Sequence, residues 1–113
     1  MANNFKLKTK NMIGTGSESV YKVPAATTTV MIGCSLANRS TNAVQASVFV
    51  SSSTSDTETN QPIYVVKDAP IATGGALEVM SGNKFVLQTA DVVKVNSDAS
   101  GSVDAALSIM EIS

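Results

Sequence analysis

The chain has 113 residues and a formal net charge of −1, so its length fits one domain, spanning residues 1–113. Hydrophobic residues make up 43% and charged residues 15%, a balance that excludes a disordered tail or a solvated helical rod. The chain has no His and one Cys, which excludes His-dependent catalytic and metal sites within one chain. The slight acidic excess argues against nucleic acid as a partner.

Two features bear on where the protein is made. No apolar run approaches the roughly 18 to 20 residues that span a membrane, and the start MANNFKLKTK lacks the apolar region of a secretory signal peptide. We therefore expect synthesis in the cytoplasm and no membrane partner. Cys34 lies among apolar residues in VMIGCSL, so we expect it to be buried and reduced.

The composition favours strands over helices, because Val, Ser and Thr are frequent and Leu occurs only five times. Segments of strand character recur about every ten residues, with Gly, Asn, Asp and Ser in the turns between them. This spacing predicts an all-β antiparallel β-sandwich of about seven to nine strands, jelly-roll or Greek-key-like, with helix nearly absent. The expected strands are 5–10, 19–23, 28–37, 43–52, 62–67, 76–80, 84–89, 92–96 and 103–112.

The segments 28–37 and 43–52 show the clearest alternation of side chains, so each is expected to bury one face. The expected core faces are Val30, Ile32, Cys34 and Leu36 in the first segment and Val44, Ala46, Val48 and Val50 in the second. In the segment 103–112 the apolar residues fit the spacing of a helix no better than the alternation of a strand, and we expect a strand.

The connection after residue 67 is expected to cross between the two sheets. Pro70 follows Asp68 and Ala69 and should bend the chain out of the strand 62–67. The chain then turns at Gly74 and Gly75 and enters the next strand.

The first ten residues form a basic segment in which Lys6, Lys8 and Lys10 alternate with Phe5 and Leu7. Residues 1–22 carry a net charge of +3, and the rest of the chain carries −4. Two interpretations remain open. The segment is either an arm that docks on another protein as an added strand, or an edge strand whose lysines deter unwanted pairing while Phe5 and Leu7 complete the core.

Four large apolar residues lie out of phase with the main apolar set of their strands. Such residues form either satellite clusters or a contact surface for another chain, and Met adapts well to irregular interfaces. Satellite packing is the more common arrangement for any one of them, but several together make self-association or docking a second interpretation. With the basic segment, the candidate partner-binding residues are Phe5, Lys6, Leu7, Lys8, Lys10, Met31, Phe49, Met80 and Met110.

The carboxylates do not form a recognisable catalytic or metal site. Asp56 and Glu58 lie in the segment 51–61, SSSTSDTETNQ, which lacks the ligand spacing of a calcium loop and is expected to be a flexible hairpin loop. We therefore expect no enzyme activity, no cofactor, no metal and no small-molecule substrate. The carboxylates expected to face solvent or cap turns are Asp91, Asp98, Asp104 and Glu111.

Three stretches resemble a known family: VYKVPAATTTVMIGCSLAN at 20–38, YVVKDAPIATGGALEVMSGNKFVLQTADVVKV at 64–95, and the ending SVDAALSIMEIS. They are similar to small virion proteins of tailed bacteriophages, common in marine and cyanobacterial phages, over nearly the whole chain. In these proteins the patterns YxVP…TTxV, KDAPI…G..L, LxxGD…V and LSxxEI recur. Where the third pattern has Gly-Asp, this chain has Ala90-Asp91.

The resemblance implies a β-sandwich that attaches to a capsid, neck or tail, and it transfers no catalytic residues. We expect a virion structural protein made in the host cytoplasm, most simply a capsid decoration or cement protein. Its partners would be other virion proteins and copies of itself. A neck or tail accessory protein is the first alternative. A glycan-binding adhesion module is the second, although the absence of Trp counts against it.

Overall fold

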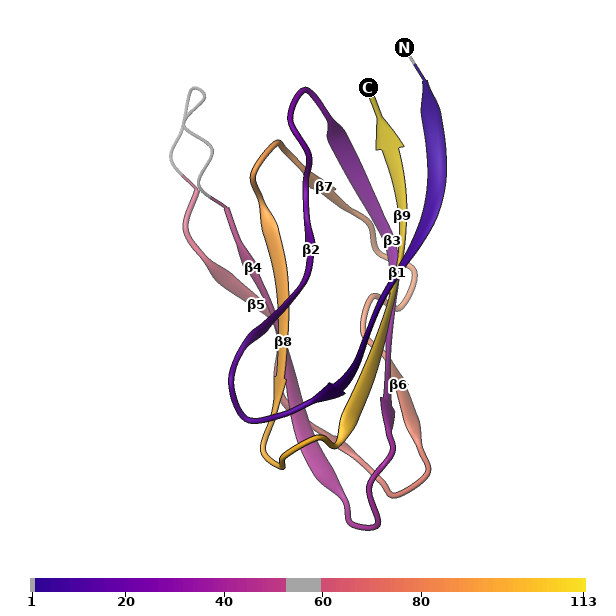
Figure 1. Cartoon of the computed structure of the whole chain (residues 1–113), viewed down its shortest axis with the longest axis vertical. Coiled ribbons are helices and arrows are strands. Elements are labelled where there is room, and N and C mark those ends of the chain that lie inside the picture. The colour runs from indigo at the N-terminus through magenta and orange to yellow at the C-terminus, as the bar shows by residue number, and fades with distance from the viewer. Residues whose placement is uncertain (1, 53–59) are drawn as a thin grey trace.

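The computed structural model describes residues 2–52 and 60–113, which fold into two packed antiparallel sheets (Figure 1). No described residue lies in a helix, so the expected β-sandwich and its nine strands are confirmed. Sheet I has the order β1-β9-β3-β6, and β7 also pairs with β3. Sheet II has the order β2-β8-β4-β5. The strands are β1 (Asn3–Ile13), β2 (Glu18–Lys22), β3 (Thr28–Asn38), β4 (Val44–Ser51), β5 (Ile63–Ile71), β6 (Ala76–Glu78), β7 (Phe85–Leu87), β8 (Val92–Ser97) and β9 (Val103–Ile112).

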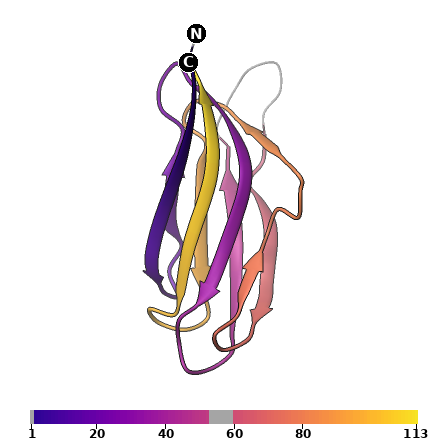
Figure 2. The same cartoon turned by 90° about the vertical axis from the view of Figure 1, so that its right-hand side faces the viewer.

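The chain crosses between the sheets at most of its connections. The crossing expected at the two glycines is confirmed, because β5 belongs to sheet II and β6 to sheet I. Gly74 adopts a positive φ of 71°, a conformation that a residue with a Cβ rarely takes. The last strand, β9, lies between β1 and β3 in sheet I (Figure 2). The N-terminal strand β1 is therefore at the edge of this sheet, and the C-terminal strand β9 is next to it.

The inner faces of the two sheets form the core. The four alternating residues of β4 are all buried, as expected, and Cys34 is buried on β3. Burial of such aliphatic side chains is the main favourable term in the folding of a domain of this size. The strand β9 supplies the other half of this layer with Val103, Ala105, Leu107 and Ile109.

The face expected for Met31 is wrong, because β3 contains a bulge. Its register with β9 shifts between Met31 and Gly33, so Ile32 is an extra residue and the alternation changes phase there. Met31 therefore lies on the inner face opposite Ile109 and is completely buried. Val30, expected in the core, lies on the outer face instead.

The end expected for the strand 62–67 is also wrong, since β5 continues to Ile71 and Pro70 pairs with Gln45. The strand β5 is the edge of sheet II, where a proline removes no ladder hydrogen bond. The pairing of β5 with β4 shifts register twice before Pro70. Asp68 lies at one of these shifts, has a positive φ of 51° and donates its N–H to Ser47 Oγ at 2.9 Å.

Candidate interaction surface

The outer face of sheet I carries a row of apolar residues that crosses four strands. Phe5 on β1 pairs with Met110 on β9, Met110 pairs with Val30 on β3, and Val30 pairs with Val86 on β7. Leu7 lies on the same side of β1, two residues further along. Figure 2 shows β1, β9 and β3 side by side on this face. We call Phe5, Leu7, Val30, Val86 and Met110 the apolar stripe.

The apolar stripe is unusually open to solvent. Phe5 is 74% exposed, Leu7 64% and Val86 66%, while Val30 and Met110 are half-buried. Isolated exposed apolar residues are common on protein surfaces, but a contiguous group on one face indicates a contact with another molecule. The stripe is therefore the strongest candidate interaction surface in the described chain.

The other end of the same face is hollowed. The row after Leu7 consists of Thr9 on β1, Ala106 on β9 and Ser35 on β3, which pair with one another. These small side chains leave a hollow of about 580 Å³. Its complete lining is Thr9, Lys10, Asn11, Ser35, Ala37, Asp104, Ala105 and Ala106.

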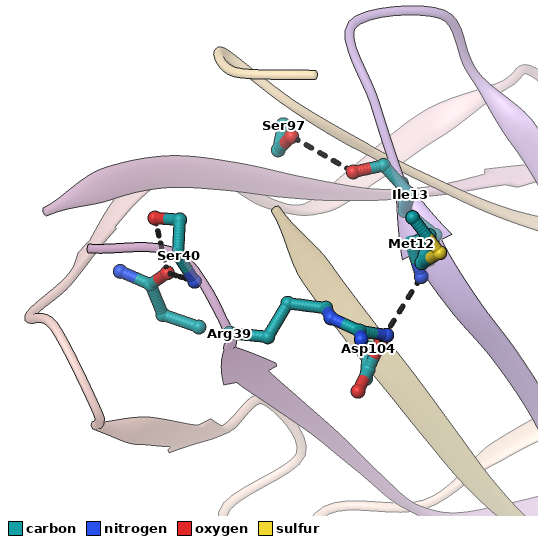
Figure 3. A network of polar contacts seen from close by, with 7 residues as sticks. Met12, Ile13, Arg39, Ser40, Ser97 and Asp104 are labelled. Atoms are coloured by element: carbon teal, nitrogen blue, oxygen red, sulfur yellow. Dashed lines mark hydrogen bonds and ion pairs between the residues drawn. The ribbon is translucent and has the colours of Figure 1, made fainter. Parts of the chain in front are cut away.

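A polar network fixes the rim of the hollow (Figure 3). The Asp104 carboxylate accepts the N–H of Met12 at 3.0 Å and a hydrogen bond from Arg39 at 3.2 Å. Met12 has a positive φ of 55° and lies where the register of β1 shifts against β9. Behind it, the Ser97 hydroxyl donates to the carbonyl of Ile13 at 3.2 Å. The end of β1 is thus tied to both sheets.

The lysines of β1 point to the opposite side from the stripe, as their alternation predicts. Lys6, Lys8 and Lys10 pair with Ile109, Leu107 and Ala105, which all lie on the inner face of β9. Lys6 Nζ lies 2.7 Å from Glu111, and Lys10 Nζ lies 3.7 Å from Glu18 on β2. The structure pairs β1 with β9 along its length as the edge strand of sheet I, but Phe5 and Leu7 stay outside the core.

Glu111 is not solvent-facing, contrary to expectation, because it belongs to the inward-facing set of β9 and is buried. Its carboxylate accepts the Tyr21 hydroxyl at 2.6 Å, and the Tyr21 oxygen lies 2.8 Å from the Thr29 hydroxyl. The hydrogen bonds from Lys6 and Tyr21 lower the pKa of Glu111 in spite of its burial. Burial and the bond to Glu111 raise the pKa of Tyr21 to about 12. This Glu111 cluster joins β9, β1 and β3 to β2 of the other sheet.

The other carboxylates of this group cap turns or strand ends, as expected. Asp98 accepts the N–H of Gln45 at 2.9 Å, and Asp91 accepts the N–H of Gln88 at 2.9 Å. Among the residues that the structure describes, no three His, Cys, Asp or Glu residues gather where they could hold a metal ion. Asp56 and Glu58 lie outside the described residues.

The other candidate residues lie apart from the stripe. Met31 and Met80 are buried in the core, so neither side chain is accessible to another chain in this structure. The strand β6 ends at Glu78, so alternation no longer determines where Met80 points, and its N–H bonds the Glu78 carboxylate at 3.0 Å. Phe49 lies on the outer face of sheet II, in an edge contact with Tyr64 at 5.4 Å between ring centres.

Cys34 has no features of a reactive thiol. It is buried on the inner face of β3, as expected. Burial, together with the nearby Glu78 carboxylate, raises the pKa of the Cys34 thiol to about 12. Since the thiolate is the nucleophilic form, this cysteine is unreactive near neutral pH.

Sequence reasoning did not identify Val86 as part of the surface. The alternation in 84–89 places Val86 opposite Phe85 and Leu87, which was a usable signal. Its meaning depends on β7 pairing with β3, a contact between residues more than fifty positions apart. The hollow has no sequence signal at all, because small residues occur throughout the chain.

Comparisons with other proteins identify a shared fold. The sequence matches no protein-family profile and no curated protein. The structure is similar to a chain of the T13 IBDV viral particle, with a TM-score of 0.59 and 11% identity over 96% of this chain and 30% of that chain. A chain of the infectious bursal disease virus Gx strain gives 0.56 and 12% over 96% and 32%. A chain of the Bacillus endospore appendages, a family of disulfide-linked pili, gives 0.53 and 11% over 99% and 87%.

These similarities concern the β-sandwich itself. This chain spans about a third of the two virus chains and most of the appendage chain. Within the described part of the chain, no helix has the length and apolar character needed to cross a membrane.

Proposed function

We propose that the protein is a non-enzymatic structural protein of a tailed-bacteriophage virion, and specifically a decoration protein on the capsid surface. The observation that carries the proposal is the apolar stripe, an uncharged group exposed on the outer face of a strongly paired sheet. A surface of this kind is typical of a subunit that assembles with other proteins.

Three further observations support this role. The sequence patterns are similar to those of tailed-phage virion proteins, and the fold is similar to a domain-sized part of viral particle chains. The chain has no His, and its described carboxylates are engaged in hydrogen bonds or ion pairs within the fold. These features favour assembly over catalysis.

A decoration protein attaches strongly because many copies bind to the same capsid. Many copies on one lattice convert modest single contacts into strong net attachment, so each chain needs only a small contact area. A chain of 113 residues with one open apolar face fits this requirement. The protein would be made in the host cytoplasm and carried in the particle.

The test is to count the copies of this protein in purified particles of the phage that encodes it, by quantitative mass spectrometry with isotope-labelled peptides. The decoration role predicts hundreds of copies per particle. A dozen or so copies would replace it with a neck or tail role. Absence from washed particles would overturn the virion role altogether.

A further inference from the structure

The outer face of sheet I divides into two halves of opposite shape about a central row. This row contains Leu7 on β1, Ser108 on β9 and Gly33 on β3, which pair in register. The row of Phe5 and Met110 lies two residues from this central row, on the side of the chain ends. Two residues in the other direction lie Thr9, Ala106 and Ser35, which line the hollow.

We infer that this face closes on a second copy of the chain, across a two-fold axis that runs along the central row. The inference rests on the proposed assembly function of the same face. A rotation of 180° about this axis places the protruding half of each copy over the hollowed half of the other. Phe5 then lies over Thr9 of the second copy, and Met110 lies over Ala106.

This arrangement is self-complementary in the way a two-fold interface requires, because one surface patch must fit its own rotated copy. Large side chains meet small ones on both sides of the axis. The sheets would pack face to face about 10 Å apart, as the sheets of a sandwich do.

The area of the face decides between this arrangement and one in which only the stripes meet. The strands β1, β9 and β3 have ten or eleven residues each, and β6 and β7 have three each, so at about 3.3 Å per residue and about 4.8 Å between strands the face presents roughly 600 Å². Closing the whole face buries about 1,200 Å² over both copies, at the lower limit of the range of specific interfaces. Stripe against stripe buries about half of that, an area typical of a crystal-packing contact.

Two carboxylates, Asp104 and Glu78, carry the charge that this contact must accommodate. The lysines of β1 lie on the inner side of sheet I, away from the facing copy. Asp104 lines the hollow, but it is paired with Arg39 at 3.2 Å and accepts the Met12 N–H. Glu78 also lies on this face, because it pairs with Ser35 and its carboxylate lies beside Gly33 of the central row. This carboxylate accepts the N–H groups of Cys34 and Met80, which offset part of its charge. The apolar stripe therefore meets small side chains, and the Glu78 carboxylates lie near the axis.

The first test measures the mass of the full-length protein by sedimentation equilibrium from about 1 µM to about 1 mM, a range that covers weak and moderate dimers. The wild type is expected to reach twice the monomer mass of 11.7 kDa. Phe5→Asp removes the protruding half and Ala106→Trp fills the hollow, and each is expected to raise the dissociation constant at least tenfold. Tyr64→Asp, which replaces a half-exposed aromatic ring on the outer face of sheet II, is the control and should not change it.

The second test locates the axis. Ser108→Cys lies on the axis, so two copies should be joined efficiently by a short bis-maleimide, whereas Met110→Cys should cross-link poorly by itself and well with Ala106→Cys. Cys34 is buried and gives a low background. Circular dichroism and thermal melting of every variant show that it remains folded.

A wild type that stays monomeric at about 1 mM would overturn the inference, as would a dimer that both Phe5→Asp and Ala106→Trp leave intact. Sensitivity to Phe5→Asp alone would also overturn it, since the stripes would then pack on each other. If the protein is a monomer but is found in particles, the dimer inference is wrong and the virion role stands. If it is a dimer but is absent from particles, the dimer inference stands and the virion role is wrong.

Discussion

The two outer faces of the sandwich both carry aromatic and aliphatic residues, but the most exposed of them lie on sheet I. On sheet II, Phe49 packs against Tyr64, and Lys67 Nζ lies 5.4 Å from the centre of the Tyr64 ring. On sheet I, Phe5 is 74% exposed in an uncharged row. Alternation shows which residues leave the core, and neighbouring strands decide whether they are then covered.

The largest expected effect tests whether the outer face of sheet I lies outside the core. Met31→Ala and Met110→Ala delete the same side chain from the inner and outer sides of two paired strands. Met31 is fully buried, so its loss should cost about 2–5 kcal/mol of unfolding free energy. Met110→Ala should cost less than about 1 kcal/mol in dilute protein, because Met110 is only half-buried.

Urea denaturation of both variants, at a concentration where the protein is monomeric, provides the measurement. Equal losses for the two methionines would show that the stripe belongs to the folding core. The comparison of the two outer faces would then fail.

The outcome for Met31 also shows what the sequence could and could not predict. The nine strands were predictable because segments of alternating or β-branched side chains are separated by turn residues. The phase of β3 was missed, because a bulge at Ile32 inserts one residue and moves Met31 from one face to the other. Its only sequence signal is Gly33, since a glycine inside a strand pattern often marks a bulge. The segment 43–52 has no inserted residue, so its alternation correctly predicted the buried residues of β4.

The candidate surface was predictable in part for the same reason. Alternation alone separates Phe5 and Leu7 from the lysines of β1. The pairing of β1 with β9 and of β7 with β3 joins residues far apart in the chain, and only these pairings turn single residues into a stripe. Glu111 continues the inward alternation of β9, but the expectation that carboxylates face solvent placed it outside, since the Tyr21 hydroxyl that bonds it comes from the other sheet.

The next prediction concerns the Glu111 cluster, which holds the stripe-bearing strand β1 against the rest of the sandwich. Tyr21→Phe removes the hydroxyl that donates to Glu111 at 2.6 Å, leaving a buried carboxylate with one fewer donor. The expected loss is about 1–3 kcal/mol of unfolding free energy. Lys22→Met, on an exposed neighbour in β2, is the control and should change little.

The pH dependence of stability sharpens this prediction. The folded-state pKa of Tyr21, about 12, exceeds the ordinary 10, so its stabilisation is complete below pH 10 and is lost as the pH rises toward 12. The pKa of Glu111 is lowered, so its contribution is complete above its ordinary pKa of 4.5 and is lost as the pH falls through the folded-state value. If Tyr21→Phe and the wild type lose the same stability between pH 10 and 12, this account is wrong.

A matched pair of phenylalanines tests the two outer faces directly. Phe49→Ala removes an edge contact with Tyr64 and a half-buried ring, so it should cost about 1–2 kcal/mol of unfolding free energy. Phe5→Ala should change monomer stability by less than about 0.5 kcal/mol, because the ring is mostly in solvent. Thermal melting in dilute protein measures both, and a larger loss for Phe5→Ala would place that ring in the fold and not at an interface.

The smallest expected effect lies at the crossing from β7 in sheet I to β8 in sheet II. Ala90 has a positive φ of 76°, which strains a residue with a Cβ by about 1–2 kcal/mol. The tailed-phage pattern has Gly at this position. Ala90→Gly relieves the strain but increases the entropy lost on folding by about 0.5–1 kcal/mol, so the net gain should be at most about 1 kcal/mol.

The backbone bonds of this turn should survive the substitution, because Ala90 N donates to the Val23 carbonyl at 3.1 Å and Asp91 N to the Gln88 carbonyl at 3.0 Å. Ala25→Gly, in an exposed turn without a positive φ, is the matched control and has no strain to relieve. The melting temperature should therefore rise by a few degrees for Ala90→Gly and stay level or fall for Ala25→Gly. A fall in both variants would show that the turn at Ala90 is unstrained and that the glycine of the related pattern serves another purpose.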